Sequence, residues 1–152
     1  MGSGYGFVCK KCDNHYSVNT GIGFMFPNEY KKLVDKIKKG RYGEEWKHLF
    51  MSTPGAVVDA EKELYICKGC GKWDVSPVAS IYAPDKPDSI EKPVHYVMKS
   101  DLESDYHIVK RYYHKCDKCG KRMHRATERE MISLPCPKCG GTDTAADLIM
   151  WD

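Results

Sequence analysis

The sequence has no long apolar run. No stretch approaches the roughly 18 consecutive apolar residues that a membrane-spanning helix needs, so no such helix is predicted. The first seven residues contain neither a basic region nor an apolar region, which argues against a secretory signal peptide. These two absences predict a cytoplasmic protein, in a reducing compartment where paired cysteines bind metal more often than they form disulfides.

Catalytic motifs are also missing. The sequence contains no nucleophile elbow, no phosphate-binding loop and no paired-carboxylate pattern. Gly21 and Gly23 lack the third glycine of a dinucleotide-binding loop. The six histidines show no metal-ligand spacing; they are His15, His48, His95, His107, His114 and His124. We therefore predict a protein that is not an enzyme.

No cysteine lies outside a Cys-x-x-Cys pair. The eight cysteines form four such pairs, which are Cys9 with Cys12, Cys67 with Cys70, Cys116 with Cys119 and Cys136 with Cys139. Two thiolates at this spacing in a tight turn converge on one ion, and a second pair completes a tetrahedron with Zn–S bonds of about 2.3 Å. The four pairs therefore predict two Cys₄ sites that hold two zinc ions.

The order of the pairs along the chain favours one way of combining them. Sixteen residues lie between Cys119 and Cys136, which suits a zinc site, and 54 residues lie between Cys12 and Cys67. We expect the first pair to join the second and the third to join the fourth. An interleaved pairing is the alternative, and it requires the connector between the two halves to fold back.

The third and fourth pairs resemble those of the zinc-ribbon superfamily. The motifs are Cys116-Asp-Lys-Cys119-Gly120-Lys and Cys136-Pro-Lys-Cys139-Gly140-Gly141, with expected strands on either side. The resemblance extends to the first half as a ribbon with a helical insertion, and the overall plan is similar to small bacterial zinc-ribbon proteins without an assigned activity. It implies metal binding and a ribbon fold. It implies no single function, because zinc ribbons occur in polymerase subunits, ribosomal proteins and nucleases.

The sequence predicts an α+β, mostly β fold with two zinc-ribbon modules. The first module covers residues 1–83 and carries a helical insert at about 28–51, with Asn28 as the expected N-cap. Residues 84–105 hold three Lys/Arg against six Asp/Glu and several prolines, which predicts an extended acidic linker that can add a strand over 94–98. The compact second ribbon covers residues 106–152. Segments rich in β-forming residues flank the cysteine pairs: Tyr5–Val8, His15–Asn19, Leu64–Ile66, Trp73–Tyr82, Tyr106–Tyr113, Arg122–Ala126 and Ala146–Trp151.

Two other chemistries use the same thiols. A Cys₄ site can hold iron for electron transfer, as in rubredoxins. A Cys-x-x-Cys pair can also be a dithiol redox centre, which usually lies at the start of a helix. No pair in this sequence leads into an amphipathic helix, which argues against the redox dithiol. The ligand set alone does not distinguish iron from zinc, and zinc is the preferred expectation.

The segment 110–125 is strongly basic. It holds seven Lys/Arg and one Asp, with aromatic residues between them, which is typical of a nucleic-acid-binding surface. Two Zn(Cys⁻)₄ centres, however, add four negative charges and turn the formal charge of +3 into about −1. Lysines beside the cysteine pairs can therefore serve to balance the thiolates. We predict a non-catalytic adaptor that presents its ribbons to a protein partner, with a nucleic-acid-binding or transcription-associated ribbon as the alternative.

Overall fold

The computed structural model describes residues 2–87 and 96–151. The fold is mixed α and β with strands in the majority, as predicted, and its sheets are antiparallel. The chain forms two compact units. Unit 1 comprises residues 1–23, 61–76 and 113–152, and unit 2 comprises residues 24–60 and 77–112. None of the helices in the described ranges has the length and apolar character needed to cross a membrane.

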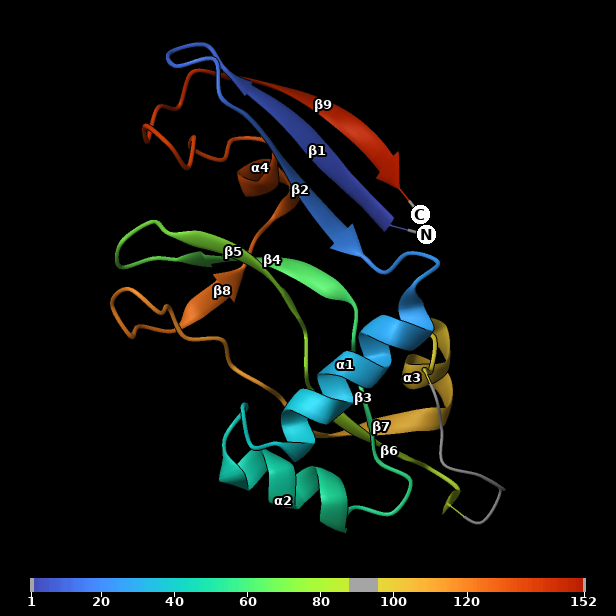
Figure 1. The fold of residues 1–152 in the computed structure, drawn as a ribbon. Helices are drawn as coiled ribbons and strands as arrows, with labels where there is room; N and C mark the ends of the chain where they lie inside the picture. Colours follow the sequence, from blue (N-terminus) through green and yellow to red (C-terminus); the bar gives the residue numbers. More distant parts are fainter. Residues whose placement is uncertain (1, 88–95, 152) are drawn as a thin grey trace. The chain divides into compact units, whose positions relative to one another are not determined.

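Unit 1 is built on a six-stranded sheet. Its strands are β1 (Gly2–Cys9), β2 (His15–Gly21), β4 (Lys62–Cys67), β5 (Trp73–Pro77), β8 (Met123–Arg125) and β9 (Thr144–Trp151). The order is β5-β4-β2-β1-β9, and β8 pairs with the end of β4. In Figure 1 the first strand, β1, lies between β2 and the last strand, β9. The sheet therefore joins the two ends of the described chain.

The core of unit 1 lies on one face of this sheet. Phe7, Val18, Leu64 and Leu134 are almost fully buried together, and burial of each such side chain contributes roughly 1.5–3 kcal/mol. Phe7 stacks on Tyr16 across the β1–β2 pair, with ring centroids 4.9 Å apart. This core anchors the segment before the last cysteine pair.

Two polar contacts strengthen that anchor. The Tyr16 hydroxyl donates a hydrogen bond to the carbonyl of Leu134 at 2.9 Å, and the Trp73 indole N–H donates to the carbonyl of Pro135 at 3.2 Å. The short helix α4 (Glu128–Met131) precedes this segment. Its Thr127 and Glu130 form a capping box, in which each side chain bonds the other residue's backbone N–H.

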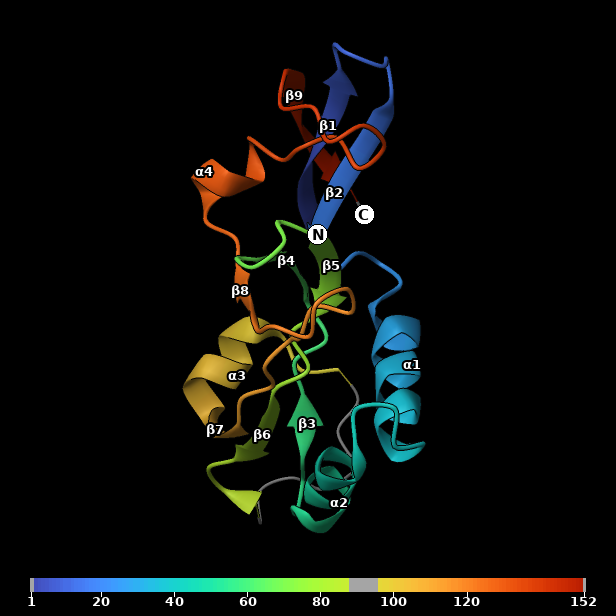
Figure 2. The same cartoon turned by 90° about the vertical axis from the view of Figure 1, so that its left-hand side faces the viewer.

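Unit 2 combines three helices with a three-stranded sheet. The helices are α1 (Phe26–Lys38), α2 (Glu44–Ser52) and α3 (Lys99–Asp105), and the strands are β3 (Val57–Val58), β6 (Ile81–Pro84) and β7 (Tyr106–Lys110). The sheet order is β3-β6-β7, and α3 packs beside β7 (Figure 2). Buried apolar side chains from both segments form the core: Tyr30, Leu33, Ile37, Trp46, Val57, Val58, Ile81 and Leu102.

The predicted helical insert is present as α1 and α2. The first helix starts at Phe26 rather than after Asn28, and its N-cap, Met25, makes no side-chain capping bond. Pro27 explains this start, since its fixed φ suits the first turn, where its missing N–H costs nothing. Asn28 therefore lies inside the first turn, and its expected role as the N-cap was wrong.

The expected segment Trp73–Tyr82 is divided between the two sheets. Its first part forms β5 in unit 1, and its last residues begin β6 in unit 2. Ala79 lies between them in the left-handed region, with φ at 60°. The Ala79 carbonyl accepts the Trp46 indole N–H at 3.0 Å, and its N–H donates to Asp59 at 2.8 Å. These bonds hold a backbone conformation that a non-glycine residue rarely adopts.

The compact units differ from the modules expected from sequence. Unit 1 draws on both halves of the chain, whereas the expected modules divided it at an acidic linker. The described part of the segment 84–105 contains the end of β6 and the whole of α3, so it is not simply extended. Residues 88–95 of the expected linker lie outside the described residues, as do 94 and 95 of the expected strand, and 96–98 form no strand.

Candidate metal centres

The four Cys-x-x-Cys turns share one backbone structure. In each turn the first cysteine's carbonyl accepts a hydrogen bond at 2.8 Å from the N–H four residues later. The first cysteine's own N–H donates to the carbonyl five residues later, at 2.8 to 2.9 Å. The first cysteines are Cys9, Cys67, Cys116 and Cys136. Each turn is thus closed at both ends, which directs its two thiols to the same side.

The residue four positions after the first cysteine is in the left-handed region. Gly71, Gly120 and Gly140 have φ values of 75°, 72° and 71°, and Asp13 takes the same place with φ at 57°. Glycine adopts this conformation without the steric cost that Cβ imposes, and aspartate is among the few other residues that tolerate it.

The eight thiols gather into two clusters within unit 1. The outer site consists of Cys9, Cys12, Cys136 and Cys139, and the inner site consists of Cys67, Cys70, Cys116 and Cys119. Within each cluster all sulfur atoms lie within 4.8 Å of one another. Every cysteine predicted from the sequence therefore belongs to a four-thiol group.

The combination of pairs is nested, which corrects the expected order. The first pair joins the fourth and the second joins the third, so neither the sequential nor the interleaved pairing is found. Strand pairing is the reason. Cys9 at the end of β1 lies opposite Thr144 of β9, and Cys67 at the end of β4 lies opposite Met123 of β8. Each pair of antiparallel strands therefore brings two Cys-x-x-Cys turns to the same end of the paired strands.

The distances between sulfur atoms fit a tetrahedral ion. They are 3.6 Å for Cys9–Cys139 and 3.7 Å for Cys12–Cys136 in the outer site. In the inner site they are 3.4 Å for Cys67–Cys119 and 3.5 Å for Cys70–Cys116. Metal–sulfur bonds of about 2.3 Å at tetrahedral angles require sulfur atoms about 3.8 Å apart, whereas a disulfide requires about 2.05 Å. Both sites could therefore hold a metal ion.

Backbone hydrogen bonds favour thiolates in the inner site. The backbone N–H of Cys70 is the main cause that lowers the pKa of Cys67, to about 6. For Cys119 a backbone bond from Lys121 acts in the same direction, but the neighbouring thiols and burial outweigh it and raise its pKa to about 11. Four thiolates at this spacing repel one another, so the cluster needs a cation to ionise completely.

The outer site has additional groups that donate hydrogen bonds to its sulfur atoms. Burial raises the pKa of Cys136, but the backbone N–H groups of Cys139 and Lys138 and the Asn14 amide lower it, to about 6 overall. The Asn14 amide nitrogen lies 3.6 Å from the Cys136 sulfur, and the Gly141 N–H lies 3.3 Å from the Cys139 sulfur. Sequence reasoning missed Asn14 as a thiolate donor.

The basic segment 110–125 is divided between the two units. Its first three residues belong to unit 2, where Tyr112 packs edge-on against Tyr42 and Trp46. In unit 1 the Arg122 guanidinium lies 3.4 Å from the ring centroid of Tyr113. Arg125 pairs with Glu63, and Lys110 pairs with Glu45 within unit 2. Three of the segment's seven basic side chains, Lys110, Arg122 and Arg125, therefore make contacts within their own units.

A lysine also links the two turns of the inner site. Lys72 follows the Cys67 turn and pairs with Asp117, which lies inside the Cys116 turn. This contact supports the idea that lysines beside the cysteines balance local negative charge. It stabilises the site only modestly, because the pair is exposed to water.

The described histidines lie outside both four-thiol groups. His114 stacks on Tyr65 at 3.9 Å between ring centroids, and the His124 ring bonds the Glu130 carboxylate at 2.9 Å. His15, His48 and His107 belong to neither cluster. His95 lies outside the described residues.

The turns do not lead into helices. The residues after Cys12 and Cys70 enter β2 and β5, and those after Cys119 and Cys139 lead to β8 and β9. A dithiol redox pair usually lies at a helix N-terminus, where the thiolate is stabilised. The observed surroundings favour metal coordination instead. No family model, no curated protein and no solved structure matches this chain, so this interpretation depends on the geometry of its own residues.

Proposed function

We propose that both sites hold structural zinc, in ribbon-like turns, and that the protein is a non-catalytic adaptor. The nested pair of four-thiol clusters supports this most directly. Four protein ligands complete the tetrahedral shell of zinc, whereas catalytic zinc sites keep one position for water or substrate. Such a site contributes folding energy, on the order of 10–16 kcal/mol of apparent binding free energy in small domains. The metals would therefore fix the ends of unit 1 and do no chemistry.

The edge strand β9 offers a surface for a protein partner. Leu148 and Met150 are two positions apart in β9 and therefore lie on the same face of the strand. Their side chains are apolar, yet they are 65% and 64% exposed. Leu148 lies opposite Tyr5, and Ala146 lies opposite Phe7. Residues directly opposite in an antiparallel pair share a face, so Leu148 continues the apolar face that carries the core.

An extended apolar segment of another protein fits this edge. In the described part of the sheet β9 pairs on one side only, so its outer backbone groups are available to an added strand. Asp147 is the one charged residue among Thr144–Trp151. An apolar strand that pairs with β9 would therefore desolvate few charged groups. This surface supports the adaptor proposal independently of the metal sites.

Photo-crosslinking tests the proposal. The chain carries photo-leucine at position 148, is metal-loaded, and is irradiated in the native cell extract. The proposal requires a crosslink to an extended, apolar segment of another protein, and the crosslink must be lost when Met150→Lys is added. Met98→Lys is the matched control, because Met98 is 60% exposed and belongs to unit 2. Crosslinks only to a second copy, or equal loss in both lysine variants, would contradict the adaptor role.

A further inference from the structure

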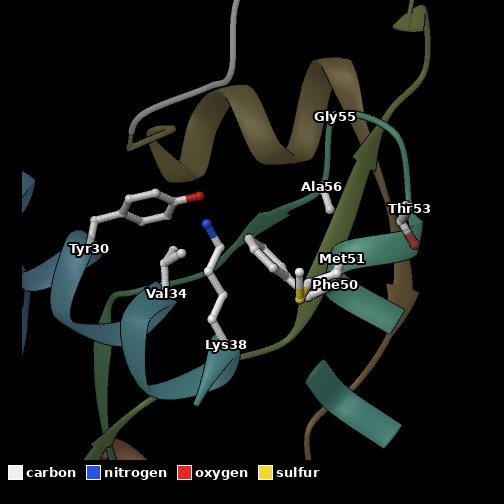
Figure 3. Close-up of a pocket in the computed structure, with 8 residues that line it drawn as sticks. All are labelled: Tyr30, Val34, Lys38, Phe50, Met51, Thr53, Gly55 and Ala56. Atoms are coloured by element: carbon white, nitrogen blue, oxygen red, sulfur yellow. The ribbon is translucent and has the colours of Figure 1, made fainter. Parts of the chain in front are cut away.

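Unit 2 contains a hollow of about 360 Å³ between α1, α2 and the loop that follows α2. Figure 3 shows the eight lining residues: Tyr30, Val34, Lys38, Phe50, Met51, Thr53, Gly55 and Ala56. Its size lies within the range of about 300–1,000 Å³ that is usual for small-molecule sites. None of the lining residues is acidic, and Lys38 is the one that carries a charge.

One stripe of α1 forms the wall of this hollow. Tyr30, Val34 and Lys38 follow one another at intervals of four residues, which places them in a row along the helix. Phe50 and Met51 of α2 face this row. The lining is therefore mostly apolar, and Lys38 and the buried Tyr30 add an ammonium and a phenol hydroxyl to it.

The Tyr30 hydroxyl and the Lys38 ammonium are both hydrogen-bond donors. In Figure 3 the Tyr30 hydroxyl and the Lys38 ammonium point toward each other across the hollow. Burial raises the pKa of Tyr30 to about 12, so the phenol keeps its proton. A backbone hydrogen bond at Val58 acts in the opposite direction on that pKa, but burial outweighs it.

The charge around the hollow attracts an anion. Lys38 has no acidic partner within 4.0 Å among the described residues. Within α1 four lysines stand against two acidic residues, Glu29 and Asp35, so the helix carries a net positive charge. An ammonium and a phenol O–H that converge on one point match a carboxylate, which accepts hydrogen bonds at both oxygens.

We propose that this hollow binds a small amphiphilic carboxylate, of the class of medium-chain fatty acids. Lys38 and Tyr30 hold the carboxylate, and the hydrocarbon chain lies against Val34, Phe50 and Met51. All eight cysteines belong to unit 1, so the site is independent of the metal centres and of the adaptor role.

Calorimetric titration with octanoate tests the charge in this proposal. The metal-loaded protein should bind octanoate roughly tenfold more tightly than 1-octanol, because the alcohol lacks the charge-assisted hydrogen bonds. Lys38→Gln should remove that preference, and Tyr30→Phe should reduce it. Lys36→Gln is the control, since it removes the same charge from the same helix but not from the hollow. Equal binding of octanoate and octanol, or equal effects of the two lysine variants, would overturn the proposal.

Methyl NMR with labelled methionines tests the location. Octanoate should shift the Met51 methyl signal, which is assigned by its loss in Met51→Leu, and should leave the Met123 and Met150 signals of unit 1 in place. The spectrum of Lys38→Gln without ligand must match that of the native chain, which separates lost binding from misfolding. Octanoate-dependent shifts confined to unit 1, or no shift at Met51 at saturating octanoate, would contradict the assignment.

Discussion

The sulfur atoms of Cys9 and Cys139 lie 3.6 Å apart, although 130 positions separate them in the chain. Cys67 and Cys119, 52 positions apart, make the corresponding contact of the inner site, so that one closed loop lies inside another. The entropic cost of closing a loop rises with its length. Metal ions that close both loops therefore constrain most of the unfolded chain.

Loss of one outer thiol should release the partner turn at the other end of the chain. In Cys136→Ser we expect the bound metal to fall from two ions to one per chain and the Cys9 and Cys12 thiols to become reactive. The inner site should keep its ion, because it shares no ligand with the outer site. Metal analysis and mass-spectrometric thiol mapping measure both effects. Exposure of Cys116 and Cys119 in place of Cys9 and Cys12 would argue for the sequential pairing.

The left-handed residue of the last turn should tolerate only glycine well. Gly140 has φ at 71°, so Gly140→Ala should destabilise unit 1 by about 1–2 kcal/mol, the usual steric cost of Cβ in this conformation. Asp13→Gly is the matched reverse change, because Asp13 takes the equivalent place with φ at 57°. This variant should be more stable than the native chain, since glycine adopts that conformation without the steric cost. Denaturant unfolding of the metal-loaded variants measures both. Equal stability of Gly140→Ala and the native chain would contradict the strain argument.

Local structure could be predicted from the sequence, because it depends on neighbouring residues. The four turns, their left-handed residues, α2 and most strands follow from residue type and spacing. The short helix α3 was missed, since its acidic sequence Lys99–Asp105 buries one side chain, Leu102. The row of Tyr30, Val34 and Lys38 could not be predicted as a site, because its facing residues come from α2 and only the packing of the two helices brings them together.

The nested pairing could not be predicted, because sequence order says little about distant strands. The long separation between Cys12 and Cys67 was attributed to an insert within one module. The deciding contact, β1 against β9, joins the two ends of the described chain. Pattern alone predicts that both segments are strands, and tertiary packing determines that they are neighbours.

The carboxyl group of Glu130 should titrate below the ordinary glutamate value of 4.5. The Thr127 backbone N–H, at 2.8 Å, is the main cause, and the His124 ring adds to it. A lowered folded-state pKa stabilises the protein above the unfolded value, and this contribution is lost as the pH falls through the folded value. Carbon-detected NMR titration gives the midpoint. His124→Asn should move it part of the way back toward 4.5, and an unchanged midpoint would exclude His124 as a cause.

Nucleic acid should bind the metal-loaded protein weakly or not at all. Arg122, Arg125 and Lys110 already contact Tyr113, Glu63 and Glu45, and the thiolates make the loaded chain slightly acidic overall. A mobility-shift series with single- and double-stranded oligonucleotides measures this across salt concentrations. A complex that persists at physiological salt and weakens steeply as salt rises would instead show phosphate contacts.

Cadmium NMR tests the nested pairing most directly. The protein is loaded with ¹¹³Cd, and through-bond correlations link each metal to the β protons of its own cysteines. The structure predicts one cadmium ion correlated with Cys9, Cys12, Cys136 and Cys139, and a second correlated with Cys67, Cys70, Cys116 and Cys119. A cadmium ion correlated with Cys9, Cys12, Cys67 and Cys70 would contradict the nested arrangement.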